Sequence, residues 1–364
     1  MAQDNAPEYS TKGMPFRRLG NSGLRVPLFS LGGWLTLGGS VKGDPVKDII
    51  KTAWDNGINT FDCAESYAGG QSEIEIGRVI KELGFRRSDL VVTTKIFWGT
   101  REGPNASGLS RKHIIEGTKE SLERLQMDYV DVIFAHRADH SVPVEEVVRA
   151  FNFVIEKGWA FYWGTSECSN AYALTLTPTA DIANKLGLIA PIAEQCEHHM
   201  LKRERAEREY APLYINYNMG TTVFSALAGG FLTGKYNEGI PEGSRLDVEQ
   251  EEQFKKKALW LKSPDGQKQV EKIRKLTELA ERDLGCKVSH LALAWVARNP
   301  NTSTIILGAS RPEQIVDNLK ALEVIPKLTP DVLQRIEEIL ENKPDSWPTW
   351  GRPALDPISR LKVL

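Results

Sequence analysis

The most regular feature of the sequence is a series of short apolar runs, each of which stops at a polar residue. A first run spans residues 28–32, and the later runs end at Asp62, Lys95, His136, Ser166, Gln195, Ser225 and Ser310. Unbroken stretches of Val, Ile and Phe are typical of strands that are buried on both faces, as the strands of a parallel sheet are. The pattern therefore predicts eight such strands.

The segments between the runs have helical periodicity, and four of them end just before a glycine, as helices often do. We expect helices over residues 45–56, 72–84, 110–125, 144–158, 170–186, 203–217, 266–284, 289–298 and 330–341. Strands that alternate with helices in this order predict an α/β protein with a (β/α)8 TIM barrel. Such barrels place their active sites at the carboxyl ends of the strands, where the polar residues would gather.

Two segments depart from the repeat. Residues 16–26 alternate around a Gly/Asn/Ser turn and predict an N-terminal hairpin, which would close the bottom of the barrel. The interval from Ser225 to Ser310 is 85 residues, and a loop of this length after strand 7 predicts a lid over the mouth. For the charged stretch 249–257 taken alone, a solvated helix is the competing interpretation.

The length and composition indicate one barrel domain. We expect a disordered N-terminus over residues 1–14, the barrel over 15–344 and a C-terminal tail over 345–364. A hydrophobic content of 41% is enough for a large core, and the net charge of -2 gives no field to attract nucleic acid or an anionic membrane. We expect no signal peptide and no membrane insertion. The 4 cysteines form no CxxC pair, which favours reduced thiols in a cytoplasmic protein.

Polar residues from three neighbouring strand ends form a candidate proton-donor system. Tyr67 follows Asp62 by five residues, and Lys95 and His136 end the next two runs. A tyrosine has an ordinary pKa near ~10 and needs a nearby cation before it exchanges protons readily at neutral pH. Lys95 would supply that cation and Asp62 would hold it. His136 would hydrogen-bond a substrate oxygen.

Other interpretations of these residues are weaker. Taken singly, an Asp or Lys at a strand end is more often a cap or a surface ion pair, and only the combination favours catalysis. His198 and His199, with His136 and His140, suggest the ligands of a metal hydrolase. However, adjacent histidines on a strand point to opposite faces, so we expect no metal site. A nucleophile elbow, a P-loop and a G-x-G-x-x-G turn after the first strand are absent.

Several segments resemble the aldo-keto reductases. They are Phe61-Asp62-Cys63-Ala64-Glu65-Ser66-Tyr67, Thr93-Thr94-Lys95, residues 109–117, residues 121–125 and Tyr129-Val130-Asp131-Val132. Within that family the chain is most similar to the voltage-gated potassium channel β subunits and their fungal and bacterial homologues. The resemblance covers about residues 16–344. It implies a barrel that binds NADP(H) across its mouth, with Tyr67 as the general acid and a small-molecule carbonyl as the substrate.

The resemblance also implies a set of cofactor-binding residues. Gly33, Trp34 and Asp62 would line the nicotinamide pocket, and Ser166 and Gln195 would hydrogen-bond the carboxamide. Ser225, Leu227 and Gly229 match the pyrophosphate turn, with Lys235 and Arg245 as lid cations. Ser310, Arg311, Gln314 and Asn318 match the adenosine 2'-phosphate site, which favours NADPH over NADH. Independently of the family, a Gly-Ala-Ser turn before a helix presents free N–H groups and Arg311 to a phosphate, although such a turn taken alone is more often an ordinary N-cap.

Two functions of different class remain open at this point. The first is an NADPH-dependent reductase of aldehydes or ketones, and the second is a redox-sensing accessory β subunit of a potassium channel with little turnover. Animal channel subunits carry Asn at the position of His136, so His136 favours turnover. The resemblance implies a homotetramer, whereas the sequence itself gives no support for a channel partner. Trp34, Trp98, Trp163, Trp347 and Trp350 suggest an aromatic substrate pocket, although a buried tryptophan is more often plain core.

Overall fold

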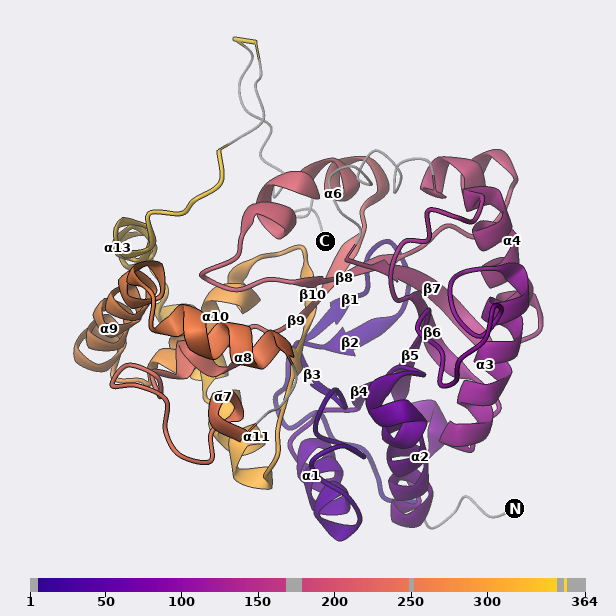
Figure 1. The fold of residues 1–364 in the computed structure, drawn as a ribbon, viewed down its shortest axis with the longest axis horizontal. Coiled ribbons are helices and arrows are strands. Elements are labelled where there is room, and N and C mark those ends of the chain that lie inside the picture. The colour runs from indigo at the N-terminus through magenta and orange to yellow at the C-terminus, as the bar shows by residue number, and fades with distance from the viewer. Residues whose placement is uncertain (1–5, 168–178, 249–251, 346–349, 352–364) are drawn as a thin grey trace.

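Eight parallel strands close into a barrel (Figure 1). The computed structural model describes residues 6–167, 179–248, 252–345 and 350–351. The strands follow one another in the order β10-β3-β4-β5-β6-β7-β8-β9, which confirms the predicted TIM barrel. Their bounds are β3 Phe29–Gly32, β4 Thr60–Asp62, β5 Val91–Ile96, β6 Val130–Ala135, β7 Ala160–Ser166, β8 Ala193–Glu197, β9 Gly220–Phe224 and β10 Thr302–Leu307. The polar residues singled out in the sequence lie within the last three residues of these strands or within three residues beyond them.

Helices surround the barrel and bury their apolar sides against it (Figure 1). The helices are α1 Asp44–Asp55, α2 Gln71–Leu83, α3 Arg111–Leu125, α4 Val144–Glu156, α6 Ala211–Tyr217, α7 Arg245–Val248, α8 Glu252–Leu261, α9 Pro264–Leu284, α10 Val288–Arg298, α11 Pro312–Leu319, α12 Ala321–Val324 and α13 Pro330–Leu340. Short helical turns are η1 Tyr67–Gly70, η2 Arg87–Asp89, η3 Arg205–Glu209, η4 Ala228–Thr233 and η5 Ile325–Lys327. Seven of the nine expected helices agree within two residues at each end. Among them, the helix expected over 110–125 begins at Arg111 because Ser110 is its N-cap.

One expected helix is interrupted. Residues 203–217 form the π-helical turn η3 followed by the separate helix α6. Pro212 lies in the first turn of α6, where its missing N–H does no harm, but it cannot continue a preceding helix. Part of the helix expected over 170–186 lies outside the described residues, while residues 179–185 are helical. Most of the expected C-terminal tail also lies outside the described residues.

An antiparallel hairpin closes the bottom of the barrel, as expected. It pairs β1 Phe16–Arg18 with β2 Arg25–Pro27. Leu19 in its turn packs with Val91 and Ile192 near the amino ends of the strands. Upstream, the Tyr9 hydroxyl donates to the carbonyl of Gly57 at 2.7 Å. Residues 6–14 are therefore at least partly packed, which shortens the N-terminal segment expected to be disordered.

The long loop after β9 lies over the carboxyl ends of the strands near β3. Phe254 on α8 is 3% exposed, and its ring centroid lies 6.4 Å from that of Trp34, which follows β3. Lys255 and Lys256 on the same helix are exposed. The described part of the charged stretch, residues 252–257, is thus helical and solvated on one side only, because its other side contacts the mouth.

We expect the hairpin turn to tolerate no side chain at Gly20. Gly20 has a φ of +59°, and an added Cβ would lie 1.9 Å from the carbonyl oxygen of Ile192. Gly158 has a φ of +72° but no atom within 4 Å of such a Cβ. Gly158→Ala should cost about 1–2 kcal/mol for the left-handed backbone, and Gly20→Ala about 1–3 kcal/mol more. Urea unfolding measures both, and equal losses would contradict close packing of the hairpin.

Candidate active site

A buried ion pair lies at the centre of the mouth. Lys95 is 0% exposed, and its Nζ lies 2.6 Å from Oδ2 of Asp62 and 2.8 Å from the carbonyl oxygen of Cys63. The second carboxylate oxygen of Asp62 accepts hydrogen bonds from Oγ1 of Thr93 at 2.6 Å and from Nε2 of Gln195 at 3.1 Å. Because every charged atom of the pair has a partner, the pair is stable in this dry environment.

Tyr67 lies against this ion pair. The Lys95 Nζ is 4.7 Å from the centroid of the Tyr67 ring. Burial raises the pKa of Tyr67 above its ordinary value, and the Lys95 ammonium opposes that rise. Burial alone lowers the pKa of Lys95, but Asp62 and Tyr67 outweigh burial and leave that pKa above its ordinary value. The expected cation is therefore present, and the phenol holds its proton at neutral pH.

His136 completes the group. Its ring lies edge-on to Tyr67, with centroids 5.6 Å apart. Burial, the Lys95 charge and the neighbouring Arg137 lower the pKa of His136 from 6.5 to about 2. Its Nδ1 is buried without a hydrogen-bond partner among the described residues. A neutral imidazole in this position can hydrogen-bond a substrate oxygen but does not act as a cationic acid. The structure thus brings together all four predicted catalytic residues.

The predicted nicotinamide-binding residues lie around the same mouth. The Gly33 N–H donates to the carbonyl of Asp62 at 2.9 Å, and Trp34 beside it is 41% exposed. Ser166 and Gln195 are buried at the ends of β7 and within β8. Gln195 is hydrogen-bonded to Asp62, so it would have to share or change this contact to bind a carboxamide.

Two cations, Lys235 and Arg245, lie in the long segment that follows β9. Ser225 and Gly229 have φ values of 55° and 67°, and the partly buried Leu227 lies between them. Burial and the nearby Arg245 lower the pKa of Lys235. Within the described part of the chain, neither Lys235 nor Arg245 forms an ion pair. Two mutually repelling cations beside a turn of this conformation make a site suited to an anion.

The turn after β10 differs from its expected form in one respect. Oε1 of Gln314 accepts hydrogen bonds from the N–H groups of Ser310 at 2.7 Å and Arg311 at 3.2 Å. These N–H groups are therefore not free, because Gln314 caps helix α11. The Arg311 side chain is exposed, and Asn318 is buried on α11. An anion here would be held by side chains unless Gln314 moved.

Sequence reasoning missed two residues and misjudged a third. Thr93 braces Asp62, and it shares a strand face with Lys95 two residues later, which is the signal that could have identified it. Arg137 donates to Ser166 at 3.4 Å and lowers the pKa of His136. Trp163 is wrong as a pocket residue: it is fully buried and stacks on Phe151 outside the barrel.

The remaining tryptophan and histidine candidates lie in different parts of the structure. Trp98 is 53% exposed beside His136, whereas Trp347 lies outside the described residues and Trp350 is 84% exposed. His198 contacts Glu207, and His199 contacts Glu197. Among residues that the structure describes, no group of three or more His, Cys, Asp and Glu is arranged to hold a metal ion.

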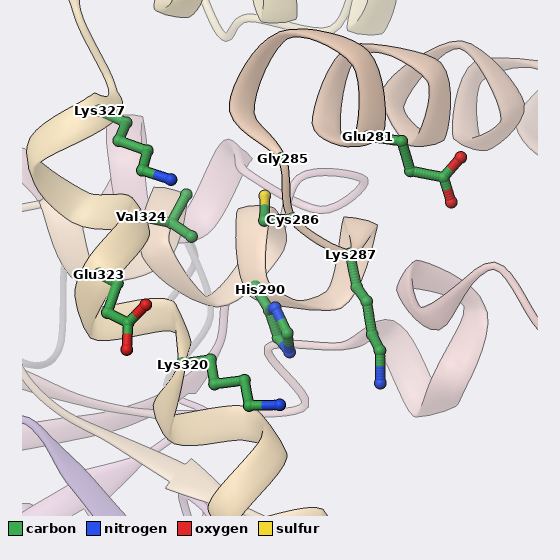
Figure 2. A pocket seen from close by; sticks show the side chains of 9 residues that line it. All are labelled: Glu281, Gly285, Cys286, Lys287, His290, Lys320, Glu323, Val324 and Lys327. Carbon is green, nitrogen blue, oxygen red and sulfur yellow. The ribbon is translucent and has the colours of Figure 1, made fainter.

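A second pocket, of about 390 Å³, lies away from the mouth between the start of α10 and the α12–η5 segment (Figure 2). Lys287, His290 and Lys320 line it. Asp317 lies 3.0 Å from Lys287, 3.4 Å from His290 and 3.5 Å from Lys320. These three basic groups thus already share a carboxylate, in contrast to Lys235 and Arg245.

Comparison with known proteins identifies the family. The chain belongs to the aldo/keto reductase family, whose model matches residues 29–341. Members of this family are oxidoreductases that generally use NAD(P)H and bind small-molecule carbonyl substrates. Within residues that the structure describes, no helix is long and apolar enough to cross a membrane.

Three relatives are similar over nearly their whole length. The "Putative voltage-gated potassium channel subunit beta" of Schizosaccharomyces pombe is 52% identical over 338 residues, which cover 92% of this chain and 96% of the relative. Proteins named "Probable voltage-gated potassium channel subunit beta" from Arabidopsis thaliana and Oryza sativa subsp. japonica are 49% and 47% identical. Each alignment covers 91% of this chain and 98% of the relative. The resemblance found in the sequence is confirmed.

The depressed pKa of His136 predicts a pH dependence of stability. Below pH 6.5 the unfolded chain binds a proton at this residue that the folded state refuses down to about pH 2. The unfolding free energy therefore decreases as the pH is lowered through this window. The unfolding free energy of wild type should drop by about 2 kcal/mol more than that of His136→Asn between pH 7 and pH 5. If urea unfolding showed equal losses of unfolding free energy for wild type and His136→Asn, His136 would not be held neutral in the folded state.

Proposed function

We propose that the protein is an NADPH-dependent reductase of aldehydes or ketones. The observation that carries the proposal is the Lys95 ammonium, which is held by Asp62 and lies over the ring of Tyr67 beside a neutral His136. This arrangement provides a proton donor and a hydrogen-bonding group at the carboxyl ends of barrel strands. That is where barrel enzymes carry out their chemistry.

Each residue has a distinct part in the proposed reaction. Tyr67 gives its phenolic proton to the carbonyl oxygen, and the Lys95 charge stabilises the phenolate that remains. His136 hydrogen-bonds the same oxygen and orients the carbonyl. When bound, NADPH supplies the hydride that reaches the carbonyl carbon. The ion pair keeps the cation in a buried position, where its effect on Tyr67 is less screened than in solvent.

The residues around the mouth fit NADPH. Lys235 and Arg245, which form no ion pair within the described residues, suit a pyrophosphate, and the exposed Arg311 beside Ser310 suits a 2'-phosphate. Gln314 and Asn318 lie on the helix that follows Ser310 and would complete that site. Gly33, Trp34, Ser166 and Gln195 would surround the nicotinamide.

A second candidate function is supported by the names of the relatives. They favour an accessory subunit that binds the cofactor and docks on a potassium channel, with little turnover. A homotetramer and a cytoplasmic location would suit either function. We favour the reductase because His136 and the proton-donor group serve turnover, whereas docking does not need them.

Tyr67→Phe distinguishes these functions. The variant keeps the ring over Lys95 but has no proton to give, so NADPH oxidation with 4-nitrobenzaldehyde, followed at 340 nm, should fall at least about 100-fold. NADPH binding, measured by quenching of its fluorescence, should remain. If wild type and variant bind NADPH and are equally inert with the aldehyde, the accessory function gains and the reductase proposal fails.

Arg311→Ala tests the choice of cofactor. Loss of a charge-assisted contact with the 2'-phosphate should weaken NADPH binding by about 10- to 100-fold and leave NADH binding within about twofold. Arg298→Ala, at the end of α10, is a matched control for removal of an arginine. Calorimetric titration of both cofactors would contradict the assignment if the two affinities fell together.

A further inference from the structure

Glu65 lies between Asp62 and Tyr67 in the sequence. Its side chain is a buried carboxylate that has no part in the proposed reaction. It is 1% exposed. Its Oε1 accepts hydrogen bonds from the backbone N–H groups of Phe97 at 2.6 Å and Gly99 at 2.8 Å. Nε2 of His113 on α3 lies 3.2 Å from the same oxygen. A buried carboxylate with these partners is fixed in position, and it fixes the backbone that binds it.

The two N–H groups flank Trp98 in the loop after β5. The Trp98 indole is half exposed, and its centroid lies 6.5 Å from that of His136 in an edge-on arrangement of 73°. Its ring also meets Phe97 edge-on, with centroids 4.7 Å apart. Glu65 thus holds the residue on each side of an aromatic ring that stands at the mouth.

A second carboxylate holds the far end of this loop. Oδ2 of Asp139, in the loop after β6, accepts a hydrogen bond from the Leu109 N–H at 2.8 Å. An added Cβ at Gly108 would lie 2.6 Å from that oxygen. The loop over residues 97–109 is therefore attached at both ends to loops that follow neighbouring strands. Of the two carboxylates, only Glu65 is bonded to the residues adjoining Trp98.

We propose that Glu65 is a positioning residue, which fixes Trp98 as one wall of the substrate pocket and so makes the site selective for carbonyls that carry an aryl group. This inference rests on the proposed reductase function. A flat indole held beside His136 offers an aromatic substituent a ring contact when the carbonyl oxygen is near Tyr67. A small aliphatic carbonyl has no ring to make this contact. Glu65 therefore affects selectivity through Trp98 and leaves the proton transfer to Tyr67.

The kinetic test compares 4-nitrobenzaldehyde with propanal. In Glu65→Ala the KM for the aryl aldehyde should rise about tenfold, with kcat within about threefold and the KM for propanal within about twofold. Trp98→Ala should raise the aryl KM similarly, and the double variant no further, because both changes remove one contact. Glu65→Gln keeps an acceptor oxygen for the two N–H groups and should restore most of the aryl KM. Additive effects, or equal rises for both aldehydes, would overturn the inference.

A spectroscopic test needs neither cofactor nor turnover. With 5-fluorotryptophan incorporated, the ¹⁹F resonance of Trp98, assigned by its loss in Trp98→Phe, should shift or broaden in Glu65→Ala and return towards wild type in Glu65→Gln. An unchanged resonance would overturn the positioning role even if KM changed. If wild type reduces neither aldehyde, the reductase proposal fails and selectivity for aryl carbonyls fails with it. The ¹⁹F spectra would still decide whether Glu65 holds Trp98.

Discussion

The buried pair of Asp62 and Lys95 is the interaction on which the candidate site depends. Two buried charges are costly unless each is compensated, and here Thr93, Gln195 and the carbonyl of Cys63 complete the compensation. The resulting fixed cation acts on both neighbours. It opposes the effect of burial on the pKa of Tyr67, and it helps to keep His136 neutral.

The barrel separates the requirements of stability from those of chemistry. At the bottom, the hairpin and the buried Leu19 in its turn fill the opening, and the Arg17 guanidinium donates to the carbonyls of Ala297, Asn299 and Thr302. At the mouth, polar side chains end the strands, and the long loop after β9 brings Lys235 and Arg245 over them. These two cations form no ion pair with any residue that the structure describes, which leaves their charge available to an anionic ligand.

The sequence predicted the strands and most helices well because their signals are local. A parallel strand buried on both faces must be apolar along its length. The polar residues that ended the runs lie within three residues of the carboxyl ends of the strands. The helix expected over 203–217 is interrupted before Pro212. The proline is a local signal for a helix start, but the helical periodicity on both sides of it favoured one continuous helix. Gln314 shows the opposite case: its side chain caps the turn that sequence alone presented as open.

The sequence by itself determined the repeat of strands and helices, the residues at the strand ends and the likeness to aldo/keto reductases. Each of these features depends on residues that are close together in the sequence. Only the tertiary structure decided which of those residues meet. Trp98 and Trp163 are equally aromatic in the sequence, yet one stands at the mouth and the other is buried among helices. Glu65 reaches Phe97 and Gly99 across 32 and 34 residues of chain. Contacts of this kind depend on strand register and barrel closure, which bring distant segments together and leave no local pattern.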